Sequence, residues 1–179
     1  MLERLFLAIE IPNEVKDSFI PVISKVKKFR GKVVPLENIH LTVKFIGETD
    51  KRDGIIKSLL DSNLKKFSLS LKGVGVFPNV NNPRVFWIGV EDSEGLKELF
   101  NFVESRLYMI GIPKDDRPFS PHITLSRFNF LPSVGLSRVI DDYRNFDFGS
   151  YEVDNFHLFK SDLNRSHPIY TKLYTFPLI

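Results

Sequence analysis

The 179-residue sequence contains no cysteine and only 4 histidines. The lack of cysteine excludes a disulfide framework, a thiol nucleophile, and a zinc or iron–sulfur centre held by thiolates. No stretch reaches the roughly 18 consecutive apolar residues that a membrane helix needs. The N-terminal MLERLFLAIEIP is too short and too charged for a signal peptide. We therefore expect a soluble, cytoplasmic protein whose chemistry uses groups other than thiols.

Several catalytic signatures are also missing. There is no Gly-x-Ser-x-Gly nucleophile elbow, no glycine-rich phosphate loop and no His-Glu-x-x-His helix. The composition is otherwise ordinary for one globular domain, with 42% hydrophobic and 26% charged residues. A net charge of +3 permits an anionic partner without predicting one.

Alternation and turn signals predict a β-α-β-α-β order in each half of the chain. A turn at 79–83 separates the halves. The expected strands are 5–11, 40–46, 67–77, 85–91, 122–128, 151–159 and 170–176, and the expected helices are 14–29, 50–66, 93–109 and 137–143.

The two halves also resemble each other in sequence. FLAIE at 6–10 matches FWIGVE at 86–91, and HLTV at 40–43 matches HITL at 122–125, both offset by about 80 residues. This repeat predicts an α+β fold in which residues 1–179 form a single bilobal domain with pseudo-twofold symmetry. Its halves are approximately 1–80 and 81–179, and each lobe is a mainly antiparallel sheet with outer helices. The active-site groove is expected between the lobes.

Each His-x-Thr-x strand places an imidazole and a hydroxyl on one face, because alternate strand residues share a face. His40 with Thr42, and His122 with Thr124, would then meet across the groove. Two imidazoles favour acid–base chemistry near neutral pH. The threonines, together with Arg127, can hold phosphate oxygens. Arg127 lies off the simple alternation, so a bulge or strand twist must turn it to the groove.

The remaining candidates are interpreted as structural. His157 is expected to pack within or at the edge of its strand, His167 to serve a turn before Pro168, and Phe45 to lie in the core. The basic run 27–32 is interpreted as a solvated helix end, with contact to RNA phosphates as the alternative. No metal site is predicted, because the histidines lack His-x-His or His-x-x-x-His spacing.

ENIHLTVKFIGE at 37–48 and RPFSPHITLSRF at 117–128 resemble the paired motifs of the 2H phosphoesterase superfamily. More narrowly, the chain resembles the RNA 2′,3′-cyclic phosphodiesterases, historically called 2′-5′ RNA ligases. The resemblance implies hydrolysis of RNA 2′,3′-cyclic phosphate ends, or of small cyclic nucleotides, to 2′-phosphomonoesters without metal, ATP or cofactor. It implies His122 as general base, His40 as general acid, and Thr42, Thr124 and Arg127 as the groups that stabilise the transition-state charge.

Other functions stay open at this point. The same site could join RNA ends through a 2′-5′ linkage without ATP, or act on a cyclic phosphodiester of another nucleotide. A non-catalytic module that binds RNA ends would use the same residues for recognition alone. We expect a monomer with no obligate protein partner.

Overall fold

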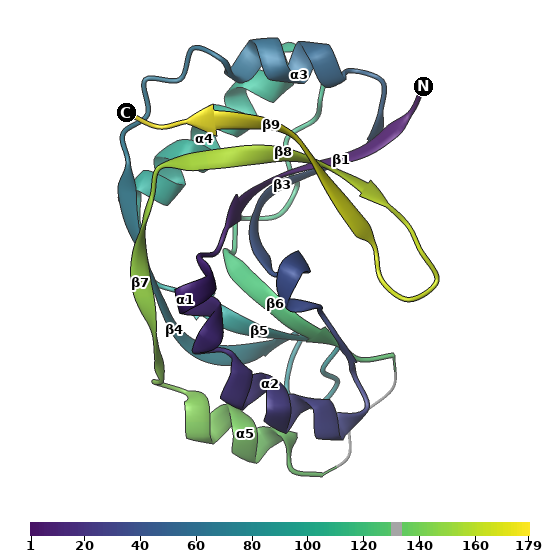
Figure 1. The fold of residues 1–179 in the computed structure, drawn as a ribbon, viewed down its shortest axis with the longest axis vertical. Helices are drawn as coiled ribbons and strands as arrows, with labels where there is room; N and C mark the ends of the chain where they lie inside the picture. Colours follow the sequence, from purple (N-terminus) through teal and green to yellow (C-terminus); the bar gives the residue numbers. More distant parts are fainter. Residues whose placement is uncertain (130–133) are drawn as a thin grey trace.

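The computed structural model describes residues 1–129 and 134–179, which form two antiparallel sheets (Figure 1). The four-stranded sheet has the order β3-β1-β8-β9, and the five-stranded sheet has the order β2-β6-β5-β4-β7. The strands of the first sheet are β1 (Glu3–Glu10), β3 (His40–Thr49), β8 (Asn155–Asp162) and β9 (Ile169–Pro177). Those of the second are β2 (Lys32–Val33), β4 (Phe67–Phe77), β5 (Val85–Val90), β6 (His122–Arg127) and β7 (Asp147–Val153).

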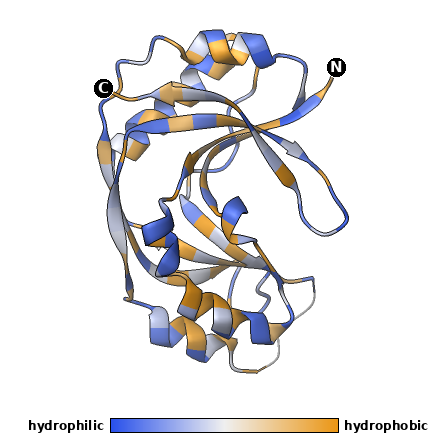
Figure 2. Ribbon diagram, in the orientation of Figure 1, coloured by the Kyte–Doolittle hydropathy of each residue, from blue (hydrophilic) through white to orange (hydrophobic). Residues whose placement is uncertain are grey.

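The longer helices pack in pairs at opposite ends of the molecule. α3 (Arg52–Leu59) contacts α4 (Glu94–Met109) next to the four-stranded sheet, and α2 (Ile20–Val26) contacts α5 (Leu136–Tyr143) next to the five-stranded sheet (Figure 1). The apolar turns of α2 and α5 lie next to each other in Figure 2. None of the helices in the described residues is both long enough and apolar enough to cross a membrane. The α+β class with outer helices is confirmed.

The two sheets each draw strands from both halves of the chain. β4 follows β3 in sequence but pairs with β5, and β8 follows β7 but pairs with β1. The four-stranded sheet thus combines β1 and β3 of the first half with β8 and β9 of the second, and the five-stranded sheet combines β2 and β4 of the first half with β5, β6 and β7 of the second. Neither sheet is complete without strands from both halves of the chain.

Three expected elements are divided or much shorter in the structure. The helix expected over 14–29 is broken into α1 (Asn13–Asp17), α2 and the 3₁₀ turn η1 (Lys27–Phe29), with Pro21 in the first turn of α2. Proline lacks an N–H and clashes with the carbonyl four residues earlier, so the helix must restart there. The helix expected over 50–66 ends at Leu59, ahead of the turn-forming residues 61–63.

The strand expected over 151–159 is two strands that belong to different sheets. β7 pairs with β4, and after Asp154 the chain continues as β8 beside β1. The carbonyl of Asp154 accepts a hydrogen bond from the Leu178 N–H at 2.8 Å. Alternation in a sequence reports which side chains share a face, and it contains no signal for the change of partner strand.

Candidate active site

A groove of about 620 Å³ contains all five residues selected from the sequence. β3 of the four-stranded sheet contacts β6 of the five-stranded sheet. β3 contributes His40 and Thr42, and β6 contributes His122, Thr124 and Arg127. The two His-x-Thr motifs therefore lie together in space, although they are far apart in the chain.

A β-bulge in β6 explains how Arg127 reaches the groove. The pairing of β6 with β5 skips Leu125, so that Thr124 and Ser126 face consecutive residues of β5. One unpaired residue inverts the alternation that follows it. Ser126 is consequently buried, while Arg127 lines the groove beside the histidine face. The predicted need for a bulge or twist is confirmed.

The equivalent bulge in β3 makes the expectation for Phe45 wrong. The pairing of β3 with β1 skips Val43, so Lys44 turns into the interior and Phe45 turns into the groove. Phe45 is 49% exposed rather than part of the core. The guanidinium carbon of Arg4 lies 4.7 Å from the centre of its ring. Phe45 occupies the same position after its histidine, five residues on, that Arg127 occupies after His122.

His40 is fixed in a defined tautomer. Its Nδ1 lies 2.7 Å from the Asn38 carbonyl oxygen, which can only accept a hydrogen bond, so Nδ1 carries the proton in the neutral ring. Nε2 then accepts a hydrogen bond from the Thr42 hydroxyl at 2.9 Å. Burial lowers the pKa of His40 to about 4, with smaller contributions from the charges of Lys16, Arg127 and His122 and against the opposing effect of the Asn38 hydrogen bond.

His122 has the same local arrangement on the opposite strand. Its Nδ1 donates to the Ser120 carbonyl oxygen at 2.8 Å, which leaves the Nε2 lone pair as an acceptor. Burial lowers the pKa of His122, and the charge of Arg127 adds to this effect against the Ser120 bond. Its ring packs edge to face on Phe77, with centroids 4.9 Å apart. Both imidazoles are therefore neutral at pH 7 when the groove holds no anion.

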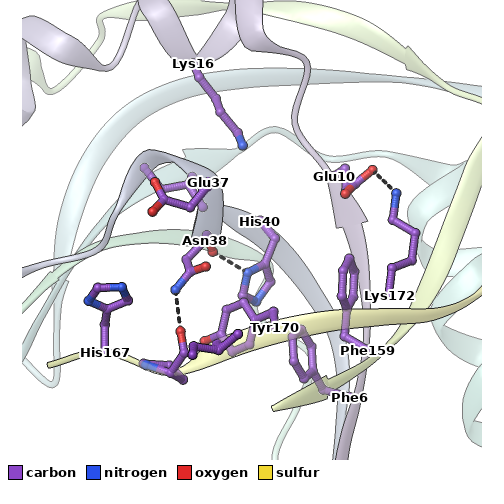
Figure 3. Close-up of a pocket in the computed structure, with 13 residues that line it drawn as sticks. Phe6, Glu10, Lys16, Glu37, Asn38, His40, Phe159, His167, Tyr170 and Lys172 are labelled. Carbon is purple, nitrogen blue, oxygen red and sulfur yellow. Dashed lines mark hydrogen bonds and ion pairs between the residues drawn. The ribbon is translucent and has the colours of Figure 1, made fainter. Parts of the chain in front are cut away.

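A second cavity, of about 350 Å³, continues behind His40 (Figure 3). Lys16 reaches into it from α1, and burial lowers the pKa of its amine against the opposing charges of Glu10 and Glu37. His167 and Tyr170 line both cavities. The sequence did not predict that these two residues line the cavities, because His167 and Tyr170 lie outside the two His-x-Thr motifs.

Tyr170 is the main residue that sequence reasoning missed. Its ring lies edge to face on His40, with centroids 5.4 Å apart, and packs on Phe6 at 4.9 Å. Burial raises the pKa of the Tyr170 phenol, opposed by the charges of Arg127 and Arg4. The alternation of residues 170–176 assigned Tyr170 only to a strand, and nothing local indicated that this strand would begin beside His40.

His157 lies on β8 and is absent from the groove lining. Its side chain is 3% exposed, and its Nδ1 lies 2.9 Å from the Thr175 hydroxyl oxygen. Its Nε2 lies 3.3 Å from a carboxylate oxygen of Glu10. The expectation of a packed, structural histidine is confirmed.

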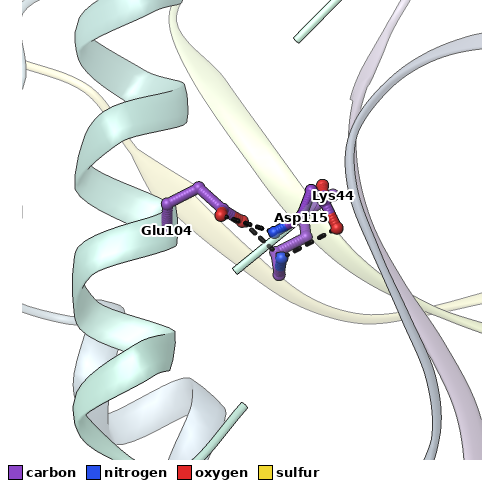
Figure 4. A network of polar contacts seen from close by, with 3 residues as sticks. All are labelled: Lys44, Glu104 and Asp115. Carbon is purple, nitrogen blue, oxygen red and sulfur yellow. Dashed lines mark hydrogen bonds and ion pairs between the residues drawn. The ribbon is translucent and has the colours of Figure 1, made fainter. Parts of the chain in front are cut away.

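A buried ion pair joins β3 to the segment that leads into β6 (Figure 4). The Lys44 amine contacts Glu104 of α4 and lies 3.2 Å from Asp115. A second oxygen of Glu104 accepts the Asp115 N–H at 3.0 Å. Lys44 and Glu104 are almost fully buried, so each charge depends on the other. The network connects the His40 strand to the chain just before the His122 strand.

Within residues 1–129 and 134–179, no three histidine, aspartate or glutamate side chains cluster in a way that would hold a metal ion. The groove presents imidazoles, hydroxyls, a guanidinium and aromatic rings. These groups can transfer protons and neutralise an anion.

The fold and the paired His-x-Thr strands define a two-histidine phosphoesterase. A family model described as LigT like Phosphoesterase matches residues 9–87 and again 88–170. The chain is 37% identical over 170 residues to an RNA 2′,3′-cyclic phosphodiesterase of Methanocaldococcus jannaschii, which covers 93% of this chain and 96% of that protein. The chain belongs to the LigT-like phosphoesterase family, and the identification made from its motifs is confirmed.

Solved structures match over nearly the full length of the sequence. The apo form of Escherichia coli LigT matches with a TM-score of 0.82 at 30% identity, covering 99% of this chain and 98% of that one. The complex of the same protein with 3′-AMP matches with a TM-score of 0.79 at 29% identity, covering 99% of both chains.

Proposed function

We propose that this protein hydrolyses 2′,3′-cyclic phosphate ends of RNA to 2′-phosphomonoesters. The observation that carries the proposal is the convergence of two His-x-Thr pairs and Arg127 on one groove. The names of the curated relatives support RNA as the substrate, and the existence of a 3′-AMP complex of E. coli LigT supports a nucleotide as ligand.

His122 acts as the general base. Its Nδ1–H is held by the Ser120 carbonyl, so its Nε2 lone pair is free to take a proton from water. The lowered pKa of His122 keeps this lone pair available at neutral pH. The water oxygen attacks phosphorus as its proton moves to Nε2.

His40 acts as the general acid. The P–O3′ bond breaks, and the departing 3′ oxygen takes the proton from Nε2 of the His40 imidazolium. Because burial lowers the free-state pKa of His40 to about 4, the imidazolium must be stabilised by the phosphate anion of the bound substrate. After the reaction His122 carries one extra proton and His40 lacks one. The enzyme returns to its starting state when His122 releases a proton to solvent and His40 takes one up.

The hydroxyl of Thr124 and the guanidinium of Arg127 hold the nonbridging oxygens. The Thr42 hydroxyl joins them once His40 is protonated, because His40 Nε2–H then donates to the Thr42 oxygen and frees its O–H for the phosphate. Charge on these oxygens grows as the five-coordinate transition state forms, and preorganised donors aimed at developing charge are commonly the largest catalytic contribution. All donors required for this step are side chains, so the proposed reaction is independent of metal ions.

Phe45 and Tyr170 form an aromatic wall beside the phosphate-binding groups, and the buried Phe6 packs on Tyr170. Aromatic rings stack on any nucleobase, with a gain of about 1–3 kcal/mol for each base. This wall supports a nucleoside phosphate over a simple alkyl phosphodiester as the substrate.

The test is to incubate the protein with an oligoribonucleotide that ends in a 2′,3′-cyclic phosphate, in the presence of EDTA, and to identify the product by ³¹P NMR. We expect a 2′-phosphomonoester, its formation unchanged by EDTA. His40→Ala and His122→Ala should each abolish turnover while the circular dichroism spectrum stays that of the unaltered protein. Wild-type turnover in both variants would refute the two-histidine mechanism, and binding without product would indicate a recognition module.

A further inference from the structure

A run of basic side chains leads away from the groove along η1 and β2. Lys27, Lys28, Arg30 and Lys32 are all exposed. No acidic side chain within residues 1–129 and 134–179 forms an ion pair with any of them. Lys25, one turn earlier on α2, is paired with an aspartate at 3.7 Å. The four charges are therefore uncompensated, and we call residues 27–32 the basic segment.

The basic segment begins at the phosphate-binding side of the groove. Lys32 pairs in register with Arg127, because β2 is the strand next to β6, and Lys32 itself lines the groove. Gly31 fixes this contact. A Cβ at this position would lie 2.5 Å from the Ser126 hydroxyl and 2.6 Å from the Phe128 ring. The absence of a side chain lets the segment lie directly on β6.

We propose that the basic segment binds the phosphodiester backbone of the RNA strand on the 5′ side of the cyclic end. The inference rests on the proposed function and names its substrate class, oligoribonucleotides in preference to cyclic mononucleotides. A cyclic phosphate closes the 3′ end of its strand, so every further nucleotide leaves the groove in one direction. The uncompensated charges that continue from Arg127 provide a path with the required sign.

The contact reads the backbone without base specificity, since phosphate contacts position a strand and carry no sequence information. For single strands, the logarithm of affinity falls with the logarithm of salt concentration by about 0.7 for each neutralised phosphate. If Lys27, Lys28 and Arg30 each meet one phosphate, the expected slope is about −2. A tenfold rise in salt would then weaken the oligomer by about 100-fold.

The experiment compares kcat/KM for 2′,3′-cyclic AMP and for an oligoribonucleotide with the same cyclic end, across a range of KCl concentrations. The test variant is Lys27→Ala/Lys28→Ala/Arg30→Ala, which leaves the groove-lining Lys32 in place. The control is Lys57→Ala/Lys65→Ala/Lys66→Ala, which removes the same charge near α3, at the opposite end of the molecule from α2 (Figure 1).

We expect the test variant to lose the steep salt dependence of kcat/KM for the oligomer and its preference for the oligomer. Its turnover of 2′,3′-cyclic AMP should be unchanged. The control should behave as the unaltered protein. An oligomer preference equal in both variants would overturn the inference, and so would an equal loss on both substrates, because the segment would then act on the groove itself. Competition by polyglutamate that is as strong as competition by unreactive RNA would also overturn the inference, in favour of a surface that binds any polyanion.

Failure of the proposed function gives a different result. If the unaltered protein cleaves neither substrate, binding is measured instead by fluorescence anisotropy with a labelled copy of the same oligoribonucleotide. Salt-dependent binding that the test variant lacks then supports the basic segment without catalysis, and identical binding by the test and control variants overturns it.

Discussion

The proposed mechanism predicts that the substrate itself makes His40 an acid. At a pKa of about 4, only about one His40 side chain in 1000 is protonated at pH 7. The Thr42 hydroxyl lies 2.9 Å from His40 Nε2, so a phosphate oxygen bound by Thr42 places the anion about 4 Å from the imidazole. At an effective dielectric constant of about 20, one negative charge at that distance stabilises the imidazolium by about 4 kcal/mol. That energy raises the pKa by about three units, to about 7.

The assay is an NMR titration of the histidine rings in His122→Ala, with and without 2′,3′-cyclic AMP. Removal of the proposed base keeps the substrate intact, and the cyclic phosphate group keeps its single negative charge throughout the titration. His157 provides the internal control, because burial lowers its pKa but it lies outside the groove lining, so its titration should not change. If the Thr42 and Arg127 signals report binding while His40 still titrates near 4, the assignment of His40 as the acid is refuted.

Three further changes test the site and its support. Arg127→Ala should lower kcat by about 10²–10³, as loss of a transition-state donor does; a rise in KM with kcat unchanged would assign it to ground-state binding only. Lys44→Met should destabilise the fold by about 3–5 kcal/mol in urea melts because Glu104 is left buried and unpaired, and adding Glu104→Leu should restore most of the loss. Gly31→Ala should cost about 1–3 kcal/mol through overlap with Phe128, and a neutral result would contradict the close packing of β2 on β6.

The repeat and its alternation predicted the parts of this protein that depend on local order. The two His-x-Thr strands face one groove because period-two alternation is a property of any strand, and the bulge near Arg127 was required by that same rule. The second bulge was missed because no polar residue demanded it. Phe45 is as compatible with a core as with a groove, and only its pairing with β1 decides between them.

Contacts between distant segments account for the features that the sequence did not predict. Tyr170 reaches His40 because β8 joins β1 and carries β9 with it, a pairing set by the whole sheet and not by residues near either side chain. Lys44 is buried because Glu104 lies opposite it on α4. A lysine in a strand ordinarily indicates a solvent-facing position, so its partner had to be known before its place could be predicted.

The two bulges also show why a duplicated motif yields one site with two different sides. Each half places a histidine, a threonine and, five residues after the histidine, a side chain turned inward by the same irregularity. In one half that side chain is Arg127, which binds the phosphate in the proposed function, and in the other it is Phe45, which would contact the nucleoside. A symmetric pair of arginines would bind phosphate without orienting its ester, and a symmetric pair of phenylalanines would leave the transition-state charge unneutralised. We propose that this asymmetry orients the ester in the groove, whose two sides are connected because β4 pairs with β5 and β8 pairs with β1.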